Sequence, residues 1–284
     1  MPTSPQLSVK KSVSVIVPMC NEEESIDLLR EKLALLQQRL ILAFEVEYCL
    51  VDDGSTDSTW NVMRTVLPAG ARCVQLRHGR NRGVGAAIRT GIEASTGSIV
   101  CTIDADCSYP PQDLCTLIEL VASGEADVAV ASPYHPDGGV LGVKPWRILL
   151  SRQCSRLYQC VSSLKLHTYT SIFRAYSGAA AKDLDFESDG FVSAAEILFC
   201  AHRKQYRVRE VPLVLRARQR GYSKIRIART IWAHLGLLFH LVQSHFTTRL
   251  QAHPARMSRV LSRSNRVSPI AFQARLGKED TPIR

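Results

Sequence analysis

The sequence predicts an α/β fold in which a mostly parallel central sheet is flanked by helices. The main observation is that short β-branched runs alternate along the front half with segments of helical periodicity. A second is that acidic clusters directly follow two of the predicted strands. The 284 residues, 45% of them apolar, are enough for a sizeable core and exclude disordered, collagen-like and disulfide-stapled chains.

The elements can be assigned in chain order. Residues 12–18 form a β-branched run closed by proline, which is typical of a buried strand. Asn21 then begins a helical pattern with three glutamates in its first turn. The same alternation predicts further strands at 45–51, 72–76, 98–103 and 127–131, and helices at 58–66, 83–95 and 112–123. Ligands of such sheets bind beyond the carboxyl ends of the strands, which is where the acidic clusters lie.

The first acidic cluster allows two interpretations. Asp52, Asp53 and Asp57 fit turn and N-cap chemistry as well as a binding role. The second cluster, Asp104 and Asp106, is harder to explain as a turn, because two neighbouring carboxylates repel one another. A divalent cation relieves that repulsion and can bridge a diphosphate. A D-x-D pair alone is a weak motif, so its weight depends on the motifs around it.

Seven motifs together point to one family. They are VPMCNE at 17–22, VDDGSTD at 51–57, NRGVGAAIRTG at 81–91, DAD at 104–106, TSIFRAY at 170–176, EVP at 210–212 and RQRGYSK at 218–224. In this order and spacing the chain resembles family-2 glycosyltransferases with the GT-A nucleotide-diphospho-sugar transferase fold. Within that family it is similar to dolichol-phosphate mannosyltransferases and polyprenyl-phosphate glycosyltransferases. The resemblance covers about residues 12–245.

The resemblance implies inverting transfer of a hexose from a nucleotide sugar to a dolichyl or undecaprenyl phosphate. The best expectation is mannose from GDP-mannose, with a UDP-hexose as the other donor, and Mg²⁺ or Mn²⁺ as cofactor. The metal ligands would be Asp104 and Asp106. The donor nucleotide would be bound by Pro18, Glu22, Asp52, Asp53, Arg82 and Asp104. The catalytic residues would be Asp104, Asp106 and Arg218, and the acceptor phosphate would meet Arg147, Ser151, Arg174 and Lys224.

A phosphate acceptor fits the residues available. A phosphate monoester has a second pKa of about 6, so its oxygen is already ionised near neutral pH and needs no strong general base. It needs positive charge instead, which holds two anionic substrates together. Residues 202–284 carry a net charge of +15 and residues 1–201 a net charge of −5, so the back half supplies that charge. We expect no nucleic-acid partner, because the chain has no recognised nucleic-acid motif.

Four positions depart from the family pattern and keep other functions open. Ser108 stands for the usual Gln, Pro133 for Arg, Thr168 for Asp and Ile172 for Gly. One alternative is a family-2 enzyme that uses a UDP-sugar and a glycan, protein or secondary-metabolite acceptor. Another is a catalytically weak, membrane-associated binding protein.

Two further patterns have competing interpretations. Gly83 and Gly85 resemble a dinucleotide fingerprint, but Ile88 occupies the place of its third glycine. We therefore interpret them as the entry to a helix near the donor, with Arg82 facing phosphate. Glu196 matches a family glutamate but fits a structural carboxylate at least as well. The scattered histidines indicate no zinc site.

The rest of the chain bears on location. Residues 225–246 have apolar side chains at helical spacing, which fits a helix packed on the sheet or one lying in a membrane interface. No run reaches the roughly 18 apolar residues of a spanning helix, and residues 1–11 do not open a signal peptide. The nine cysteines favour reduced thiols. We expect a cytoplasmic protein that contacts a membrane peripherally or through an anchoring partner.

The expected domain organisation has four parts. These are a flexible N-terminus at 1–11, a catalytic domain at 12–224, an amphipathic helix at 225–248 and a basic tail at 249–284.

Overall fold

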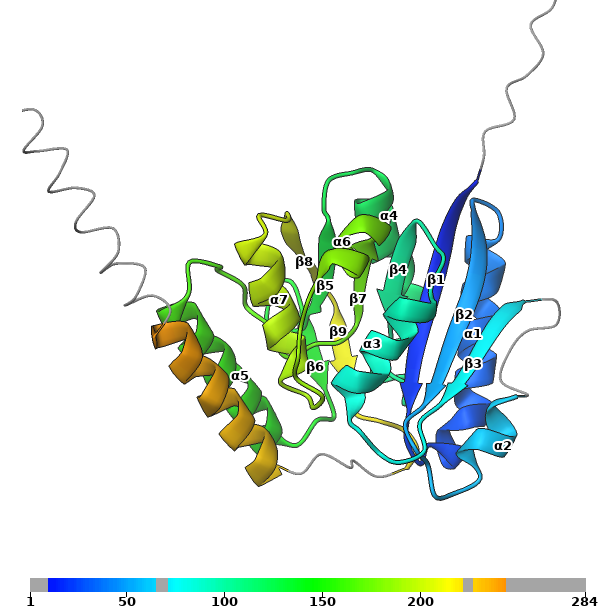
Figure 1. The fold of residues 1–284 in the computed structure, drawn as a ribbon, viewed down its shortest axis with the longest axis horizontal. Coiled ribbons are helices and arrows are strands. Elements are labelled where there is room, and N and C mark those ends of the chain that lie inside the picture. The colour runs from blue at the N-terminus through cyan, green and yellow to red at the C-terminus, as the bar shows by residue number, and fades with distance from the viewer. Residues whose placement is uncertain (1–9, 65–70, 222–226, 244–284) are drawn as a thin grey trace, which may run out of the picture. The chain divides into compact units, whose positions relative to one another are not determined.

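The computed structural model describes residues 10–64, 71–221 and 227–243 (Figure 1). Residues 1–239 form one compact unit and residues 240–284 a second, of which only 240–243 are described. The predicted basic tail at 249–284 therefore lies outside the described residues, as does Lys224.

A seven-stranded sheet has the order β3-β2-β1-β4-β7-β5-β8. Its strands are β1 (Lys11–Met19), β2 (Phe44–Asp52), β3 (Arg72–Arg77), β4 (Ile99–Thr102), β5 (Val128–Ser132), β7 (Arg174–Ser177) and β8 (Val208–Pro212). All pair in parallel except β7, which runs antiparallel to both β4 and β5. The mostly parallel sheet is thus confirmed. β6 (Gly139–Leu141) and β9 (Val214–Arg216) pair as a small second sheet.

Helices cover both faces of the large sheet (Figure 1). One face carries α1 (Ile26–Leu40), α2 (Thr59–Met63) and α4 (Leu114–Ala122), preceded by the 3₁₀ turns Glu23–Ser25 and Pro111–Asp113. The other carries α3 (Val84–Ala94), α6 (Gly178–Asp183) and α7 (Ser193–Arg203). All the predicted strands and helices of the front half are present. α5 (Pro145–Val161), which the sequence did not predict, follows β6.

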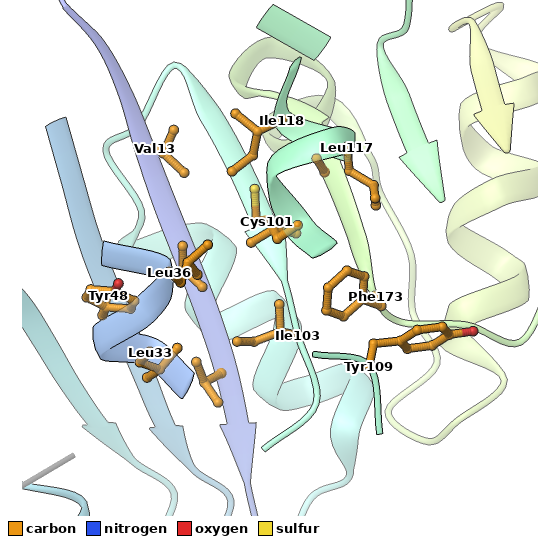
Figure 2. Packing of buried hydrophobic residues seen from close by; sticks show 14 of the residues in the cluster. Val13, Leu33, Leu36, Tyr48, Cys101, Ile103, Tyr109, Leu117, Ile118 and Phe173 are labelled. Carbon is orange, nitrogen blue, oxygen red and sulfur yellow. The ribbon is translucent and has the colours of Figure 1, made fainter. Parts of the chain in front are cut away.

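The core fills the space between the sheet and the helices α1 and α4. Figure 2 shows Leu33 and Leu36 of α1 next to Tyr48 of β2, with Ile118 of α4 close to β1 and β4. These side chains are fully buried. Each such aliphatic side chain contributes roughly 1.5–3 kcal/mol relative to an exposed one. The rigid layer they form fixes the strand ends that carry the acidic clusters.

All nine cysteines lie among the described residues as free thiols. Several lie in the interior, where burial raises their pKa; for Cys49 and Cys107 it rises to about 12. Thiols with such a pKa stay protonated and unreactive at neutral pH.

A further helix occupies residues 227–243. Its buried His234 accepts or donates a hydrogen bond through Nδ1 with the Tyr158 hydroxyl of α5 at 2.7 Å. The Tyr158 ring in turn packs against the rings of Tyr169 and Phe199. Within the described residues, no helix combines the length and hydropathy required to cross a bilayer.

Candidate active site

The loops after β1 and β2 are fastened to each other at the carboxyl edge of the sheet. Asn21 has a positive φ of 51°, and its Oδ1 accepts a hydrogen bond from the Thr56 amide at 2.7 Å. The Glu22 amide donates to the Thr59 hydroxyl, also at 2.7 Å. The two loops border a pocket of about 260 Å³ that is lined by Asn21, Glu22, Glu23, Glu24, Thr56, Asp57 and Gly221.

Asp53, predicted to bind the donor, is buried and holds the next loop along the sheet. Its Oδ1 accepts from the Arg82 amide at 2.9 Å, and its Oδ2 accepts from the Gly83 amide at 2.7 Å. His78 Nδ1 lies 2.6 Å from the same carboxylate. Both oxygens are therefore engaged with the protein, and Asp53 positions the residues that lead into α3.

Asp52 and Pro18 are likewise interior residues. Asp52 Oδ1 accepts from the Ser55 amide at 3.0 Å, and its Oδ2 lies 3.1 Å from Arg77 Nε. Pro18 is buried within β1 and pairs with Val51 of β2. Of the predicted donor residues, only Glu22 lines the pocket. Arg82 is exposed and lies two residues before the start of α3.

The D-x-D pair lies directly after β4. Arg218 Nη2 donates to Asp106 Oδ2 at 2.6 Å and lies 3.5 Å from Glu22 Oε1. The Ser108 amide donates to Asp106 Oδ1 at 2.9 Å, across the left-handed residue Cys107 with φ 54°. The structure thus joins three residues from separate motifs: Glu22 from β1, Asp106 from β4 and Arg218 from beyond β9.

The electrostatics of this cluster favour a bound cation. Burial, and then the neighbouring negative charge of Asp106, raise the pKa of Asp104, while the positive charge of Arg218 lowers it. The Arg218 guanidinium already occupies a cationic position against Asp106. Two carboxylate oxygen donors of this kind suit Mg²⁺ or Mn²⁺.

The described residues include no group of three or more His, Cys, Asp or Glu side chains arranged to hold a metal. The oxygens of a diphosphate are of the kind that would complete the coordination of a divalent ion at Asp104 and Asp106.

The glycines at the start of α3 serve close packing. A Cβ on Gly83, where φ is 116°, would lie 2.3 Å from the Asp189 carbonyl oxygen. A Cβ on Gly85 would lie 2.2 Å from the Ser188 carbonyl oxygen, and the Gly85 amide donates to Asp189 at 2.7 Å. The helix entry is therefore covered by residues 188–190. The Glu196 carboxylate holds that segment by accepting from the Glu187 and Ser188 amides, which is the structural role considered above.

α5 brings two of the predicted acceptor residues together. Arg147 and Ser151 lie one turn apart on this helix, and the Arg147 guanidinium lies 5.3 Å from the Trp146 ring. The Ser151 hydroxyl is 2.9 Å from the Thr170 hydroxyl, in the segment just before β7. This contact connects α5 to the edge of the sheet where Asp104 lies.

Arg174 is placed in the interior of the sheet. Its side chain is 0% exposed in β7. Nη2 donates to the carbonyls of Tyr169 at 3.2 Å and Ala194 at 2.6 Å. Burial lowers the pKa of this guanidinium. The Nη2 contacts join the segment before β7 to α7, while Nε and Nη1 take no part in them, so the phosphate contact predicted for Arg174 stays a prediction.

The four departures from the family pattern lie in two places. Ser108 is next to the D-x-D pair, and its carbonyl accepts from the Arg216 amide at 2.9 Å. The others line the β5 and β7 side: Pro133 is buried directly after β5, and the Thr168 hydroxyl lies 2.9 Å from the Ser132 hydroxyl. The buried Ile172 accepts a hydrogen bond from Thr102 through its carbonyl.

Sequence reasoning gave no role to several residues that shape this edge. Asn21 and Thr59 fasten the donor-side loops, and Glu210 accepts from the His167 and Thr168 amides at 2.8 and 3.0 Å. Asn21, Glu210 and Thr170 all lie inside the quoted motifs, which was the available signal. The contact of Thr170 with α5 is visible only in the structure.

Comparison with known proteins agrees with this geometry. The family model described as "Glycosyl transferase family 2" matches residues 14–185, more than half of the chain. The chain belongs to glycosyl transferase family 2. The matched region contains the β1, β2 and β4 loops and both aspartates of the D-x-D pair.

Curated relatives within the family act on polyprenyl phosphates. Polyprenol monophosphomannose synthase of Mycolicibacterium smegmatis is 30% identical over 220 residues, which cover 74% of this chain and 80% of the relative. Undecaprenyl-phosphate 4-deoxy-4-formamido-L-arabinose transferase of Pseudomonas paraeruginosa is 29% identical, over 84% of this chain and 66% of the relative. Dolichol-phosphate mannosyltransferase of Pyrococcus furiosus is 28% identical, over 81% of this chain and 64% of the relative. The chain thus spans about two thirds of the length of the Pseudomonas relative.

Solved structures confirm the GT-A fold of the family-2 chain. Glucosyl-3-phosphoglycerate synthase from Mycobacterium tuberculosis, in complex with Mn²⁺ and UDP-glucose, superimposes with a TM-score of 0.58 at 18% identity. The alignment covers 82% of this chain and 78% of that protein.

Proposed function

We propose that this chain transfers a hexose from a nucleotide sugar to a polyprenyl phosphate, with inversion at the anomeric carbon. The observation that carries the proposal is the meeting of Asp106, Glu22 and Arg218, of which Glu22 also lines the pocket between the β1 and β2 loops. This arrangement offers a cavity for the nucleoside part of the donor and charged groups for its diphosphate. The names of the curated relatives support the same reaction class.

The proposed reaction needs no strong general base. An attacking phosphate oxygen is already ionised near neutral pH, so the site has to bring two anions together. A Mg²⁺ or Mn²⁺ ion held by Asp104 and Asp106 would neutralise the diphosphate and stabilise the departing nucleotide diphosphate. Arg218 adds positive charge at the same carboxylates. We further propose mannose from GDP-mannose; the two relatives named for mannose support the sugar.

A transfer assay tests this function. Radiolabelled sugar from a panel of GDP- and UDP-sugars is offered with undecaprenyl or dolichyl phosphate and Mn²⁺ or Mg²⁺. We expect organic-extractable product that disappears on chelation and in Asp106→Ala. Asp137→Ala is the matched control, because Asp137 is an exposed carboxylate outside both acidic clusters. Donor hydrolysis without a lipid product would move the acceptor to a glycan, protein or secondary metabolite. Donor binding without turnover would favour the catalytically weak binding protein, and the absence of both binding and turnover would indicate a missing partner or a retired active site.

We also propose that the chain reaches its lipid acceptor by peripheral contact with a membrane. Large apolar side chains are exposed on α5 and on the helix at 227–243, including Leu149 at 58%, Trp232 at 74% and Phe239 at 60%. α5 also carries Arg147 and Ser151, so the apolar surface and the acceptor-side residues share one helix. An apolar helix face with basic residues nearby binds the interface of anionic bilayers.

Trp232→Ser tests this contact. Losing a buried indole in the interface is expected to weaken binding to vesicles of phosphatidylglycerol and phosphatidylcholine by about tenfold or more. The free energy of unfolding should stay within about 0.5 kcal/mol of wild type, because Trp232 is mostly exposed. Trp60→Ser is a control for indole loss away from these helices. Unchanged vesicle binding in Trp232→Ser and in Leu149→Ser would reject the membrane contact.

A further inference from the structure

A polar cluster along α5 includes an exposed arginine, Arg152, to which the sequence gave no role. The Arg152 guanidinium lies over the ring of Tyr134, with Cζ 5.1 Å from the ring centroid. Its neighbour Ser151 lies 2.9 Å from Thr170 through the two hydroxyl oxygens. A hydrogen bond from Ser151 and the positive charge of Arg152 both lower the pKa of Tyr134, against the larger effect of burial, which raises it. One guanidinium and three hydroxyls therefore lie close together.

The topology places this cluster at the same edge of the sheet as the D-x-D pair. Tyr134 follows the carboxyl end of β5, which runs in the direction of β1 and β4. Thr170 precedes β7, which is antiparallel, so the start of β7 lies at that edge too. Tyr109 is close to both groups: burial raises its pKa most, and Asp104 and Tyr134 raise it further. The cluster thus lies at the sheet edge that carries Asp104.

The way Arg152 is held leaves it suited to an anion. A guanidinium that stacks on a ring is oriented by the π face and keeps its N–H donors in the plane of the group. Those donors form a fork that matches two phosphate oxygens. Arg174, the arginine predicted for this role, uses its Nη2 for two interior carbonyls. The acceptor side would otherwise depend on Arg147, which stacks on Trp146 at the start of α5.

We propose that Arg152, stacked on Tyr134, binds the phosphate of the acceptor together with the Ser151 and Thr170 hydroxyls. The assignment rests on the proposed function, since it names a contact for the acceptor of that reaction. It makes Arg152 a determinant of the preference for a phosphorylated acceptor over a neutral hydroxyl. Tyr134 becomes a positioning residue, because it orients the guanidinium.

The test measures binding and turnover separately in Arg152→Gln and Arg152→Lys. The probe is farnesyl phosphate, with its dissociation constant taken from ³¹P chemical shifts and its KM from the transfer assay. A lost charge-assisted, bidentate contact predicts a rise of about tenfold or more in both constants for Arg152→Gln. Arg152→Lys should recover only part of the loss, because a lysine offers a point charge. The KM of the nucleotide sugar should not change.

Arg156→Gln is the matched control, since it removes the same charge from an exposed position one turn further along α5. It should change both constants by less than about twofold. Equal effects of Arg152→Gln and Arg156→Gln would show that Arg152 only attracts the anionic probe non-specifically, and would overturn the proposal. Tyr134→Phe keeps the stacking ring and should bind the probe more tightly than Tyr134→Leu. If these two variants bound it equally, the positioning role of the ring would be excluded.

The binding arm separates this proposal from the proposed function. If the wild-type protein binds farnesyl phosphate, Arg152→Gln loses that binding and no sugar is transferred, the Arg152 site stands and the transferase reaction is rejected. If sugar is transferred to the lipid and Arg152→Gln leaves the KM unaltered, the transferase reaction stands and the Arg152 site is rejected. A wild-type protein that neither binds farnesyl phosphate nor transfers sugar to it would overturn both.

Discussion

The donor side and the acceptor side of the candidate site are built in different ways. On the donor side, the buried carboxylates Asp52 and Asp53 accept hydrogen bonds from backbone amides of the loops that they shape. On the acceptor side, hydroxyls and ring-stacked guanidiniums from α5 meet segments that flank β5 and β7. The first arrangement fixes the main chain, whereas the second depends on how one helix packs on the sheet.

The departures from the family pattern are divided unevenly between the two sides. A carboxylate that accepts hydrogen bonds from two or three buried groups cannot be exchanged without leaving donors unpaired. Three of the four departures, Pro133, Thr168 and Ile172, lie on the acceptor side, at buried positions outside α5. There the Thr168 hydroxyl meets the Ser132 hydroxyl, and the Ile172 carbonyl accepts from Thr102.

The largest effect should come from the buried arginine between the two sides. Arg174→Ala leaves a cavity and two carbonyls without their donor, and we expect it to lower the free energy of unfolding by about 4 kcal/mol. Arg174→Met fills much of the volume and should cost about half as much. Urea unfolding measures both. If the Arg174→Met protein folded well and had a tenfold higher KM for the acceptor, Arg174 would be a residue of the acceptor site.

The second-largest effect should come from removing the carboxylate of Asp53. Asp53→Ala leaves the Arg82 and Gly83 amides and the His78 ring without an acceptor, so the free energy of unfolding should fall by about 3 kcal/mol. The donor KM should rise in the folded fraction, because the loop that leads into α3 loses its position. Asp137→Ala, at a side chain that is 79% exposed, should change stability by less than about 0.5 kcal/mol. Equal stability of the two variants would contradict the structural role of Asp53.

The smallest of these effects depends on pH and concerns the helix at 227–243. Burial lowers the pKa of His234 to about 4, whereas an unfolded histidine has a pKa of about 6.5. Between these values the unfolded state binds more protons than the folded state, so stability falls as the pH drops below about 6.5 and does not change above it. The loss should reach about 2 kcal/mol at pH 5.

Hydrogen exchange of residues 227–239 between pH 7 and pH 5 measures that loss. His234→Gln should remove the extra acid sensitivity, while His240→Gln, an exposed position on the same helix, should keep it. Identical pH profiles for wild type and His234→Gln would show that this histidine does not anchor the helix.

The sequence by itself determined the front half of the molecule. Its strands and helices could be predicted because each has a clear period and an acidic or glycine-rich turn after it. The pocket residue Glu22 and the D-x-D pair could be found because short motifs place them at strand ends. Asp52 and Asn21 find their partners in the same loop or in the loop of the neighbouring strand, whereas Glu22 and Asp106 meet Arg218 from far along the sequence.

Only the tertiary structure decided which side chains of the second half are buried and which of them meet. The antiparallel insertion of β7 between β4 and β5 buries Arg174, although its motif had indicated an acceptor contact. The pairing of Ser151 with Thr170 and of Arg152 with Tyr134 joins residues that no local pattern connects. The physical reason is that periodicity reports which face of an element is apolar, while the direction of a polar side chain depends on the element that packs against it.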